Sequence, residues 1–268
     1  MSGKWFLSLL GITFASAAQA EWALNMRTGV TDLSAETYGL HMMVFWWCVG
    51  IGVVVFGAMI YSLIRHRKSV GAKPAKFTHS MTAEILWTAV PVVILLIMAI
   101  PAAETLVKLE DSRDPDLTIV ITGYQWRWHY KYQDEDLEFY SSLATPSLEA
   151  RRKQSGIDPR TVDNYLLDVD HPVVVPVGAK VRLLMTSNDV VHSWWVPDLA
   201  IKKDAVPGMV NETWFRAKET GTFRGQCTEL CGRGHGYMPI VVEVVAPDAY
   251  QAWVDTRTDT GAQVANAQ

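Results

Sequence analysis

The chain has 268 residues, of which 49% are hydrophobic and 19% are charged, with eleven tryptophans and three cysteines. Few charges and many aromatic residues exclude a disordered, solvating protein. A formal net charge of −4 excludes a generally basic nucleic-acid binder, so no nucleic-acid partner is expected. Three cysteines are too few for a disulfide-rich scaffold. Apolar residues gather in three runs before about residue 110, which favours a membrane protein that also carries a soluble domain.

The first apolar run has the features of a secretory signal peptide. Lys4 precedes an apolar stretch that ends at Phe14, and Ala18-Gln19-Ala20 fits the small-x-small pattern of a cleavage site. We predict a signal peptide over residues 1–20 and an exported segment over residues 21–37. An uncleaved membrane anchor is the alternative, but this run is short and ends in small residues.

Two longer runs predict membrane-spanning helices. Residues 40–64 contain no formally charged side chain apart from His41, and as a helix they would extend about 37 Å, enough to cross a bilayer. The other run begins near Glu84 and contains Pro91, which a spanning helix tolerates better than a soluble one. The predicted spans cover residues 38–64 and 81–109.

The loop between the two spans, residues 65–80, indicates the orientation in the membrane. It holds five lysine and arginine residues and no acidic residue. By the positive-inside rule this loop is cytoplasmic. Both outer ends of the helical hairpin then lie on the exported side, in agreement with the signal peptide.

Short strand-like runs predict an all-β domain over residues 110–250, a sandwich or barrel. They cover residues 117–122, 124–132, 165–169, 173–177, 180–186, 191–196, 213–217, 221–226 and 240–245, with turn sequences between them. Residues 145–163 are rich in charge, which predicts a surface insertion with a helical turn. Residues 251–268 are predicted to be a C-terminal tail.

From residue 110 onward the chain has twenty-three acidic and sixteen basic residues, a net charge of −7. A surface of that sign can steer a basic soluble partner. The candidate docking residues are Asp134, Glu135, Asp136, Glu138, Asp189 and Asp198. The alternative for each of them is a solvated loop charge without a partner.

The strongest sign of chemistry is the segment Cys227-x3-Cys231-x3-His235-x2-Met238. It places two thiols, an imidazole and a thioether within twelve residues, and glycines allow the loop to turn tightly. Soft sulfur ligands with imidazole and a methionine favour copper. A disulfide between the two cysteines would account for neither His235 nor Met238, and a zinc site would not need the methionine.

Two bridging thiolates can hold two metal ions, each of which needs a histidine of its own. The second histidine must therefore come from elsewhere in the chain. His192, at the start of a predicted strand, is the first candidate. His129 and His171 are competing candidates.

An aromatic residue occupies every even position from Tyr124 to Tyr132. This two-residue period predicts one strand with five rings on one face. A packed aromatic face explains most of these rings without any function.

Four separated segments carry a resemblance to a known family. They are Glu84-Ile85-Leu86-Trp87-Thr88, Gly123-Tyr124-Gln125-Trp126-Arg127-Trp128, Asp189-Val190-Val191-His192-Ser193-Trp194, and residues 225–239 with the two cysteines. In this order, over about residues 38–255, the chain resembles subunit II of bacterial and mitochondrial cytochrome c oxidase. Tyr124 and Arg127 depart from the mitochondrial-type Gly-His-Gln-Trp-Tyr-Trp.

The resemblance implies two transmembrane helices as a hairpin, followed by a cupredoxin-like Greek-key β-sandwich that holds a binuclear copper centre, CuA. The implied copper ligands are His192, Cys227, Glu229 through its backbone carbonyl, Cys231, His235 and Met238. The Glu229 side chain would also bind a magnesium ion shared with subunit I. Trp126 matches the family's tryptophan that accepts electrons. Glu84 matches the mouth of the K proton channel, although a carboxylate also suits a helix N-terminus there.

The implied function is that of an electron relay. The protein would accept electrons from reduced cytochrome c at CuA and pass them to haem in subunit I, where oxygen is reduced to water and protons are pumped. The implied partners are subunits I and III, cytochrome c and the membrane, and the haem groups belong to the partner subunit. The implied location is the bacterial inner membrane, with the C-terminal domain in the periplasm.

Three rival interpretations share part of this pattern. A quinol oxidase subunit has the same architecture without the copper ligands. A membrane-anchored copper carrier would bind the metal at an exposed, labile site. The CuA domain of nitrous oxide reductase lacks the pair of spans.

Overall fold

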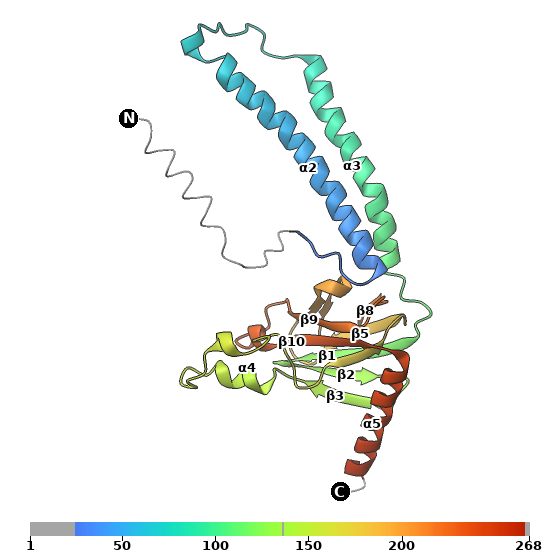
Figure 1. Ribbon diagram of the computed structural model, residues 1–268. Coiled ribbons are helices and arrows are strands. Elements are labelled where there is room, and N and C mark those ends of the chain that lie inside the picture. The colour runs from blue at the N-terminus through green and yellow to red at the C-terminus, as the bar shows by residue number, and fades with distance from the viewer. Residues whose placement is uncertain (1–24, 136, 266–268) are drawn as a thin grey trace.

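The computed structural model describes residues 25–135 and 137–265, so the predicted signal peptide and Asp136 lie outside the described residues. Two long helices, α2 (Asp32–Arg65) and α3 (Met81–Leu109), run side by side as an antiparallel hairpin above a β-sandwich (Figure 1). Both are long and apolar enough to cross a membrane. Their apolar side chains are largely exposed, as for Val53 and Leu95, which leaves them free to contact lipid.

The first span starts earlier than expected because its N-terminus is capped. The Thr31 hydroxyl accepts a hydrogen bond from the backbone N–H of Ser34 at 2.9 Å, and the Ser34 hydroxyl accepts one from the backbone N–H of Thr31 at 2.9 Å. This reciprocal capping satisfies two of the free N–H groups at the helix start. The helix therefore begins at Asp32. The connection to α3 contains one short 3-10 turn, η1 (Lys68–Val70).

The soluble domain consists of two five-stranded sheets packed face to face. The first has the order β3-β2-β1-β5-β8 and the second has the order β4-β10-β9-β6-β7. The strands are β1 (Leu117–Tyr124), β2 (Arg127–Tyr132), β3 (Leu137–Ser141), β4 (Val173–Pro176), β5 (Val181–Ser187), β6 (His192–Val196), β7 (Ile201–Ala205), β8 (Asn211–Phe215), β9 (Gly221–Cys227) and β10 (Pro239–Val245). The chain changes sheet after β3, β4, β5, β7 and β8, as in a Greek-key sandwich.

The core lies between the two sheets and follows from the two-residue period of the strands. In β1, Ile119 and Ile121 are fully buried, and Val242 and Val244 face them from β10 in the same core cluster. Burial of this kind is the main force that holds two sheets together. The all-β prediction for this domain is confirmed.

The prediction of a single strand over residues 124–132 is wrong. The chain turns at Gln125 and Trp126, so that Tyr124 pairs with Arg127 across a β1–β2 hairpin. Three rings of the aromatic series, those of Trp128, Tyr130 and Tyr132, form the buried face of β2. Aromatic and polar residues continue to alternate through the turn, so the turn could not be detected from the periodicity.

The strand predicted over residues 165–169 is also wrong, because Asn164 and Leu166 have positive φ angles of 49° and 62°. Val169 makes only an isolated bridge to Leu143. The predicted insertion is confirmed, with a short helix α4 (Thr145–Ala150) and a 3-10 turn η2 (Pro159–Thr161). Strands β3 and β7 were not predicted, since their sequences mix charged and apolar residues.

The hairpin is fastened to the sandwich at one corner. The backbone N–H of Val30 donates to the carbonyl of Asp198 at 2.8 Å, and Lys218 forms an ion pair with Asp32. Where α3 ends, the Trp214 indole donates to the carbonyl of Lys108 at 3.0 Å. Because both helices are held, the sandwich is attached to the membrane segment at several points rather than by a single linker.

A C-terminal helix, α5 (Pro247–Ala265), covers one edge of the sandwich where a tail was expected. The Trp253 ring lies 5.5 Å from that of Tyr132 and 6.3 Å from that of Phe139, between ring centroids. Aromatic pairs at these separations add stability beyond their buried area. The helix therefore contacts β3 and β4 and packs its Trp253 ring against the edge of the core.

We expect Trp253→Ala to lower the free energy of unfolding by about 2 kcal/mol, because it removes a large, partly buried ring from this cluster. Chemical denaturation of the purified full chain measures this. Gln251→Ala is the matched control, because Gln251 is exposed on the same helix and its amide donates along the helix to Asp255. Its effect should stay within about 0.5 kcal/mol. Equal losses in the two variants would contradict the role given to Trp253.

Candidate metal centre

The candidate metal-binding residues meet at one end of the second sheet. His192 is the first residue of β6 and Cys227 is the last residue of β9, and these strands pair with Trp194 opposite Cys227. The loop after β9 contains Cys231 and the short 3-10 turn η4 (His235–Tyr237), and it returns to Met238 just before β10. Strand pairing thus brings the distant histidine to the cysteine loop.

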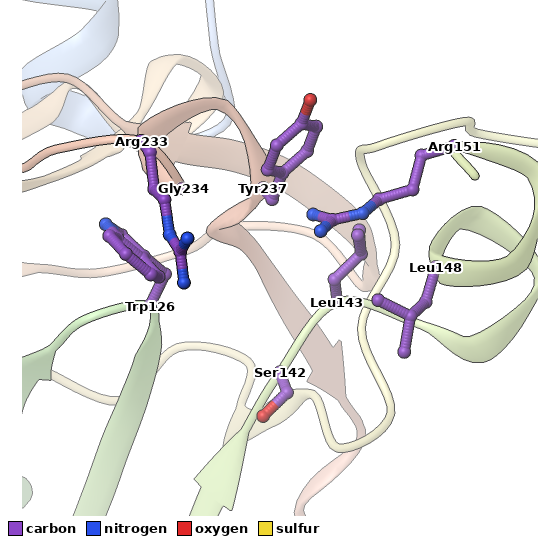
Figure 2. A pocket seen from close by; sticks show the side chains of 8 residues that line it. All are labelled: Trp126, Ser142, Leu143, Leu148, Arg151, Arg233, Gly234 and Tyr237. Atoms are coloured by element: carbon purple, nitrogen blue, oxygen red, sulfur yellow. The ribbon is translucent and has the colours of Figure 1, made fainter. Parts of the chain in front are cut away.

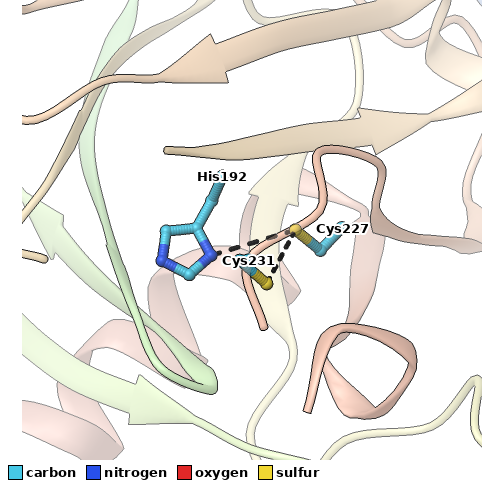
Figure 3. Close-up of side chains that lie close together, drawn as sticks. All are labelled: His192, Cys227 and Cys231. Atoms are coloured by element: carbon cyan, nitrogen blue, oxygen red, sulfur yellow. Dashed lines mark hydrogen bonds between the residues drawn. The ribbon is translucent and has the colours of Figure 1, made fainter. Parts of the chain in front are cut away.

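The sulfur and nitrogen atoms face one another in a small buried cluster (Figure 3). The Cys227 sulfur lies 3.9 Å from the Cys231 sulfur and 3.9 Å from Nδ1 of His192. The Cys231 sulfur lies 3.5 Å from Nδ1 of His235. Each thiol therefore has an imidazole nitrogen of its own.

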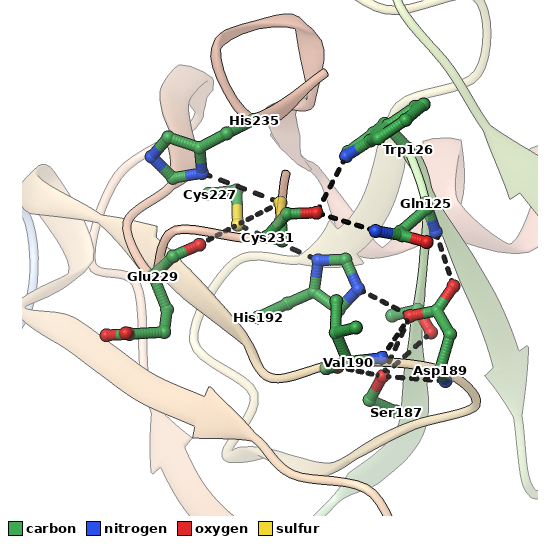
Figure 4. Close-up of polar contacts among 11 residues, drawn as sticks. Gln125, Trp126, Ser187, Asp189, Val190, His192, Cys227, Glu229, Cys231 and His235 are labelled. Carbon is green, nitrogen blue, oxygen red and sulfur yellow. Dashed lines mark hydrogen bonds and ion pairs between the residues drawn. The ribbon is translucent and has the colours of Figure 1, made fainter. Parts of the chain in front are cut away.

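Two further candidate donors belong to Glu229 and Met238, residues whose backbone carbonyls lie close to Cys227. The backbone carbonyl oxygen of Glu229 is 3.5 Å from the Cys227 sulfur, while its exposed carboxylate points away (Figure 4). Met238 is buried in the same core cluster, and its carbonyl accepts a hydrogen bond from the N–H of Cys227 at 3.0 Å. Neither competing histidine joins the cluster: His129 lies near Glu138 and His171 lies near Asp170.

This donor set fits copper. Both cysteines are free, and their sulfurs are farther apart than the roughly 2 Å of a disulfide bond. A single tetrahedral zinc ion would use the two thiols and the two imidazoles. It would not need the Glu229 carbonyl or the Met238 thioether. Soft thiolates with imidazoles and a weak thioether are the ligands that copper selects.

The two thiols differ in acidity. Burial raises the pKa of Cys231 to about 12, and the neighbouring Cys227 sulfur adds to the rise. Burial also disfavours the Cys227 thiolate, but contacts with His192 and with the backbone of Ser193 and Glu229 outweigh it and lower the pKa to about 7. Cys227 therefore loses its proton readily, whereas the proton of Cys231 is released when a bound cation stabilises the second thiolate.

Surrounding residues hold the His192 ring in one orientation. Its Nε2 lies 2.9 Å from Oδ1 of Asp189, and its ring meets that of Trp128 edge-on with centroids 5.8 Å apart. Gly123 leaves the space for this ring, since a Cβ there would lie 2.7 Å from His192 Cδ2. A ring nitrogen bonded to a carboxylate is how proteins orient a metal-binding histidine.

Trp126 is bonded directly to the candidate metal-binding loop, residues 228–238 between β9 and β10 (called the metal-binding loop below). Its indole N–H donates to the carbonyl of Cys231 at 3.0 Å, and the Gln125 amide donates to the same oxygen at 2.8 Å (Figure 4). The indole also rests on Gly234, where a Cβ would lie 2.2 Å from the ring. A short covalent and hydrogen-bonded route therefore joins the partly buried indole to a sulfur of the cluster.

The predicted acidic residues do not gather around Trp126. Asp134 and Glu135 lie in the turn after β2, and six residues of strand put them about 20 Å from the turn that holds Trp126. The carboxylate of Asp189 accepts hydrogen bonds from the backbone N–H groups of Gln125 and Val190 in addition to its contact with His192. It is thus an internal support of the site.

Glu84 lies far from this cluster, near the start of α3. Its side chain accepts a hydrogen bond from the backbone N–H of Ser80 at 3.3 Å, which suits the helix N-terminus. About 38 Å of helix separates it from the end of α3 that meets the sandwich. The structure therefore does not bring it together with the metal-binding residues.

Sequence reasoning missed three residues that shape the site: Gln125, Gly123 and Gly234. Each lies within one of the two segments named in the sequence analysis, residues 123–128 and 225–239. Glycines beside a metal-binding motif were a usable signal, because a missing side chain often marks the close approach of another group. The amide of Gln125 gave no such signal, since its partner is a backbone carbonyl 106 residues away.

Comparison with known proteins gives consistent matches along the chain. The family described as "Cytochrome C oxidase subunit II, periplasmic domain" matches residues 117–245, and "Cytochrome C oxidase subunit II, transmembrane domain" matches residues 19–105. A probable cytochrome c oxidase subunit 2 of Rickettsia bellii is 38% identical, with 92% of this chain and 88% of the relative covered. Cytochrome c oxidase subunit 2 of Cereibacter sphaeroides is also 38% identical, with 92% and 87% covered.

A solved structure is similar over the soluble domain. The periplasmic domain of subunit II of cytochrome oxidase from Bradyrhizobium japonicum is 41% identical, with 56% of this chain and 98% of that domain covered and a TM-score of 0.48. The two matched family regions coincide with the two apolar helices and the cupredoxin-like sandwich, in the expected order. This chain therefore belongs to the cytochrome c oxidase subunit II family, the subunits of an oxidoreductase complex.

Proposed function

We propose that this chain accepts electrons from a reduced cytochrome c at a binuclear copper centre, CuA, and passes them to haem in subunit I for the reduction of oxygen. The observation that carries this proposal is the pairing of each buried thiol with its own imidazole nitrogen, at 3.9 Å for Cys227 and 3.5 Å for Cys231. This arrangement gives each thiol an imidazole partner, so the residues present could hold two copper ions.

The residues proposed to hold the copper ions are His192, Cys227, Glu229 through its carbonyl, Cys231, His235 and Met238. When bound, the two copper ions would supply a one-electron redox centre at these residues. The protein keeps water from the thiols, since both are buried, and fixes the ligand positions through strand pairing and the support of Asp189. Little movement is then needed between the two redox states.

Trp126 is proposed to receive the electron from the donor. Its partly buried ring lies at the surface of the metal-binding loop, and its N–H bond to the carbonyl of Cys231 leads to a thiol through a few covalent bonds. Electrons would leave on the side of Glu229 and Leu230. Both are exposed, Leu230 to 78%, as expected for a surface that subunit I covers.

Three further assignments belong to the same proposal. The Glu229 carboxylate would bind the magnesium ion shared with subunit I. Glu84 would lie at the mouth of the K proton channel, in contact with subunit I. The hairpin would place the chain in the bacterial inner membrane with subunits I and III, the loop at residues 65–80 in the cytoplasm and the sandwich in the periplasm.

Copper loading of the purified full chain tests the centre. We expect two copper ions per chain and a mixed-valence EPR signal shared equally by both nuclei. Cys231→Ser should abolish that signal and leave at most one copper ion, because one shared thiolate is lost. Cys48→Ser is the matched control, since Cys48 lies in α2 outside the site, and it should keep both ions. One zinc ion per chain, or a disulfide without metal, would refute the proposal.

A pair of glycine variants tests the role of Trp126. Gly234→Ala should slow the oxidation of reduced cytochrome c by the complex about tenfold or more, because its Cβ would displace the indole from the loop. Gly236→Ala makes the same change two residues away, where nothing lies within 4 Å of the added carbon, and should keep the rate. Copper content should be unchanged in both. A fast Gly234→Ala enzyme would argue against electron transfer through Trp126.

Asp189→Asn tests the support of His192. The amide is nearly the same size but lacks the charge that orients the imidazole and stabilises its N–H. Copper affinity should fall by roughly 10- to 100-fold, and the optical bands of the centre should shift. Competition with a copper chelator and an absorption spectrum measure these effects. If affinity and spectrum match the wild type, Asp189 does not act through His192.

A further inference from the structure

The connection between the two apolar helices lies at the end of the hairpin that is farthest from the β-sandwich (Figure 1). Residues 65–80, called the basic loop below, comprise the last residue of α2 and this connection. The basic loop holds five cationic side chains, all of them exposed: Arg65, Arg67, Lys68, Lys73 and Lys76.

The charges of the basic loop are not balanced within the chain. No carboxylate occurs between Glu36, near the other end of α2, and Glu84. Even with Glu84 counted as a full negative charge, residues 65–84 carry a net charge of +4. Among the described residues, none of the five cationic side chains forms an ion pair or a hydrogen bond. All five are therefore available to an anion from outside the chain.

A tight turn keeps three of these cations together. The N–H of Val70 donates to the carbonyl of Arg67 at 3.1 Å, and the N–H of Gly71 donates to the carbonyl of Lys68 at 3.0 Å. Gly71 has a φ of 72°, a left-handed conformation that glycine adopts without strain. The turn holds Arg67 and Lys68 close to Arg65 at the end of α2.

Two apolar side chains of the basic loop are also exposed. Val70 is 49% exposed and Phe77 is 75% exposed. Val70 stands between Lys68 and Lys73 in the sequence, and Phe77 follows Lys76 directly. Cationic and apolar residues in one segment are typical of chains that lie in the headgroup region of a bilayer. Orientation of the hairpin during insertion needs only the positive charges and does not account for Phe77.

Aromatic residues mark the level of the membrane surface beside the basic loop. Tyr61 is 61% exposed and precedes Arg65 by about one helical turn, and Trp87 is 66% exposed about 9 Å along α3 from Met81. Tyrosine and tryptophan collect where the hydrocarbon meets the headgroups. The basic loop joins the two helices beyond these rings, so both of its ends lie at headgroup level.

We propose that the basic loop binds anionic phospholipids, with its cations on the phosphate groups and with Val70 and Phe77 inserted among the upper acyl chains. The inference rests on the proposed placement of the hairpin in the membrane and does not depend on the copper centre. Each lysine or arginine close to an anionic bilayer strengthens binding about fivefold. Arginine adds two parallel hydrogen bonds to a phosphate.

The test places the purified full chain in nanodiscs of phosphatidylcholine with an increasing share of phosphatidylglycerol. An environment-sensitive dye is attached at Ala75→Cys, an exposed position of the basic loop, in a Cys48→Ser background. The remaining cysteines, Cys227 and Cys231, are buried. We expect the emission to shift to shorter wavelength as phosphatidylglycerol is added, and less so at high salt, which screens the attraction. No response to phosphatidylglycerol would overturn the inference.

Variants separate the two parts of the proposed contact. Lys73→Gln with Lys76→Gln should raise the share of phosphatidylglycerol needed for half of the shift by about tenfold or more. Arg152→Gln with Lys153→Gln removes the same charge from exposed positions of the exported domain and should have no effect. Equal effects of the two double variants would overturn the role of the basic loop.

Phe77→Asn keeps every charge and should reduce the size of the emission shift at saturating phosphatidylglycerol, because the basic loop then lies less deeply in the bilayer. An unchanged shift would overturn the insertion of the apolar side chains. Both faces of a nanodisc are open to solvent, so these results do not depend on the orientation of the chain.

Three further outcomes identify the ligand and separate the proposals. Inorganic phosphate that produces the same shift in pure phosphatidylcholine would mark the basic loop as a general phosphate site and overturn lipid binding. The copper spectrum is recorded on the same sample. A mixed-valence copper centre without a response to phosphatidylglycerol would reject this inference alone. A response to phosphatidylglycerol without a copper centre would support this inference and refute the proposed function.

Discussion

Strand β9 passes so close to strand β6 that position 225 has room only for glycine. A Cβ there would lie 1.9 Å from the carbonyl oxygen of Trp195. This approach permits the register in which Trp194 lies opposite Cys227, and that register puts the Cys227 sulfur beside His192. The positions of Cys231 and His235 depend on this contact as well, because the loop that carries them starts where β9 ends.

The residues around the cluster form a continuous support. Asp189 links His192 to the backbone of Gln125, and the side chains of Gln125 and Trp126 both bond to the carbonyl of Cys231. The two halves of the donor set are therefore connected through one turn of the first sheet. Such a support would keep the positions of the proposed ligands constant when the charge of a bound centre changes by one electron, as the proposed electron relay requires.

The sequence predicted those features that depend on local spacing. Two apolar runs of spanning length and the cluster from Cys227 to Met238 could be identified from their own residues alone. The sequence made His192 the first of three candidates for the partner histidine, the resemblance to a family supported it, and the structure places it beside Cys227. What could not be predicted depends on contacts between distant segments. The aromatic alternation ran unbroken through the turn at Gln125 and Trp126, which is held from outside by Asp189 and the carbonyl of Cys231.

The distribution of charged residues on the surface also could not be predicted from the sequence. A count along the chain gives an acidic exported part, and Asp134 and Glu135 stand out in the sequence. Their position depends on where the hairpin turns, and the fold moves them to the opposite end of β2 from Trp126. Arg151 and Arg233, which line a hollow of about 550 Å³ beside Trp126 (Figure 2), come from segments 82 residues apart, so no window of sequence contains both. The net charge therefore predicts the electrostatic potential far from the domain, but it does not predict the charge of the surface that a partner contacts.

Strand β6 connects the metal site with the membrane attachment. It begins at His192, and the turn after it holds Asp198 and Leu199, whose carbonyls accept hydrogen bonds from Val30 and Thr31 at the start of the first span. Five residues of strand cover about 17 Å. Since the strand is paired on both sides, by β7 and β9, that separation is rigid. The distance between the site and the two apolar helices is thus set by one buried strand, which suits the proposed transfer of electrons to a partner within the membrane.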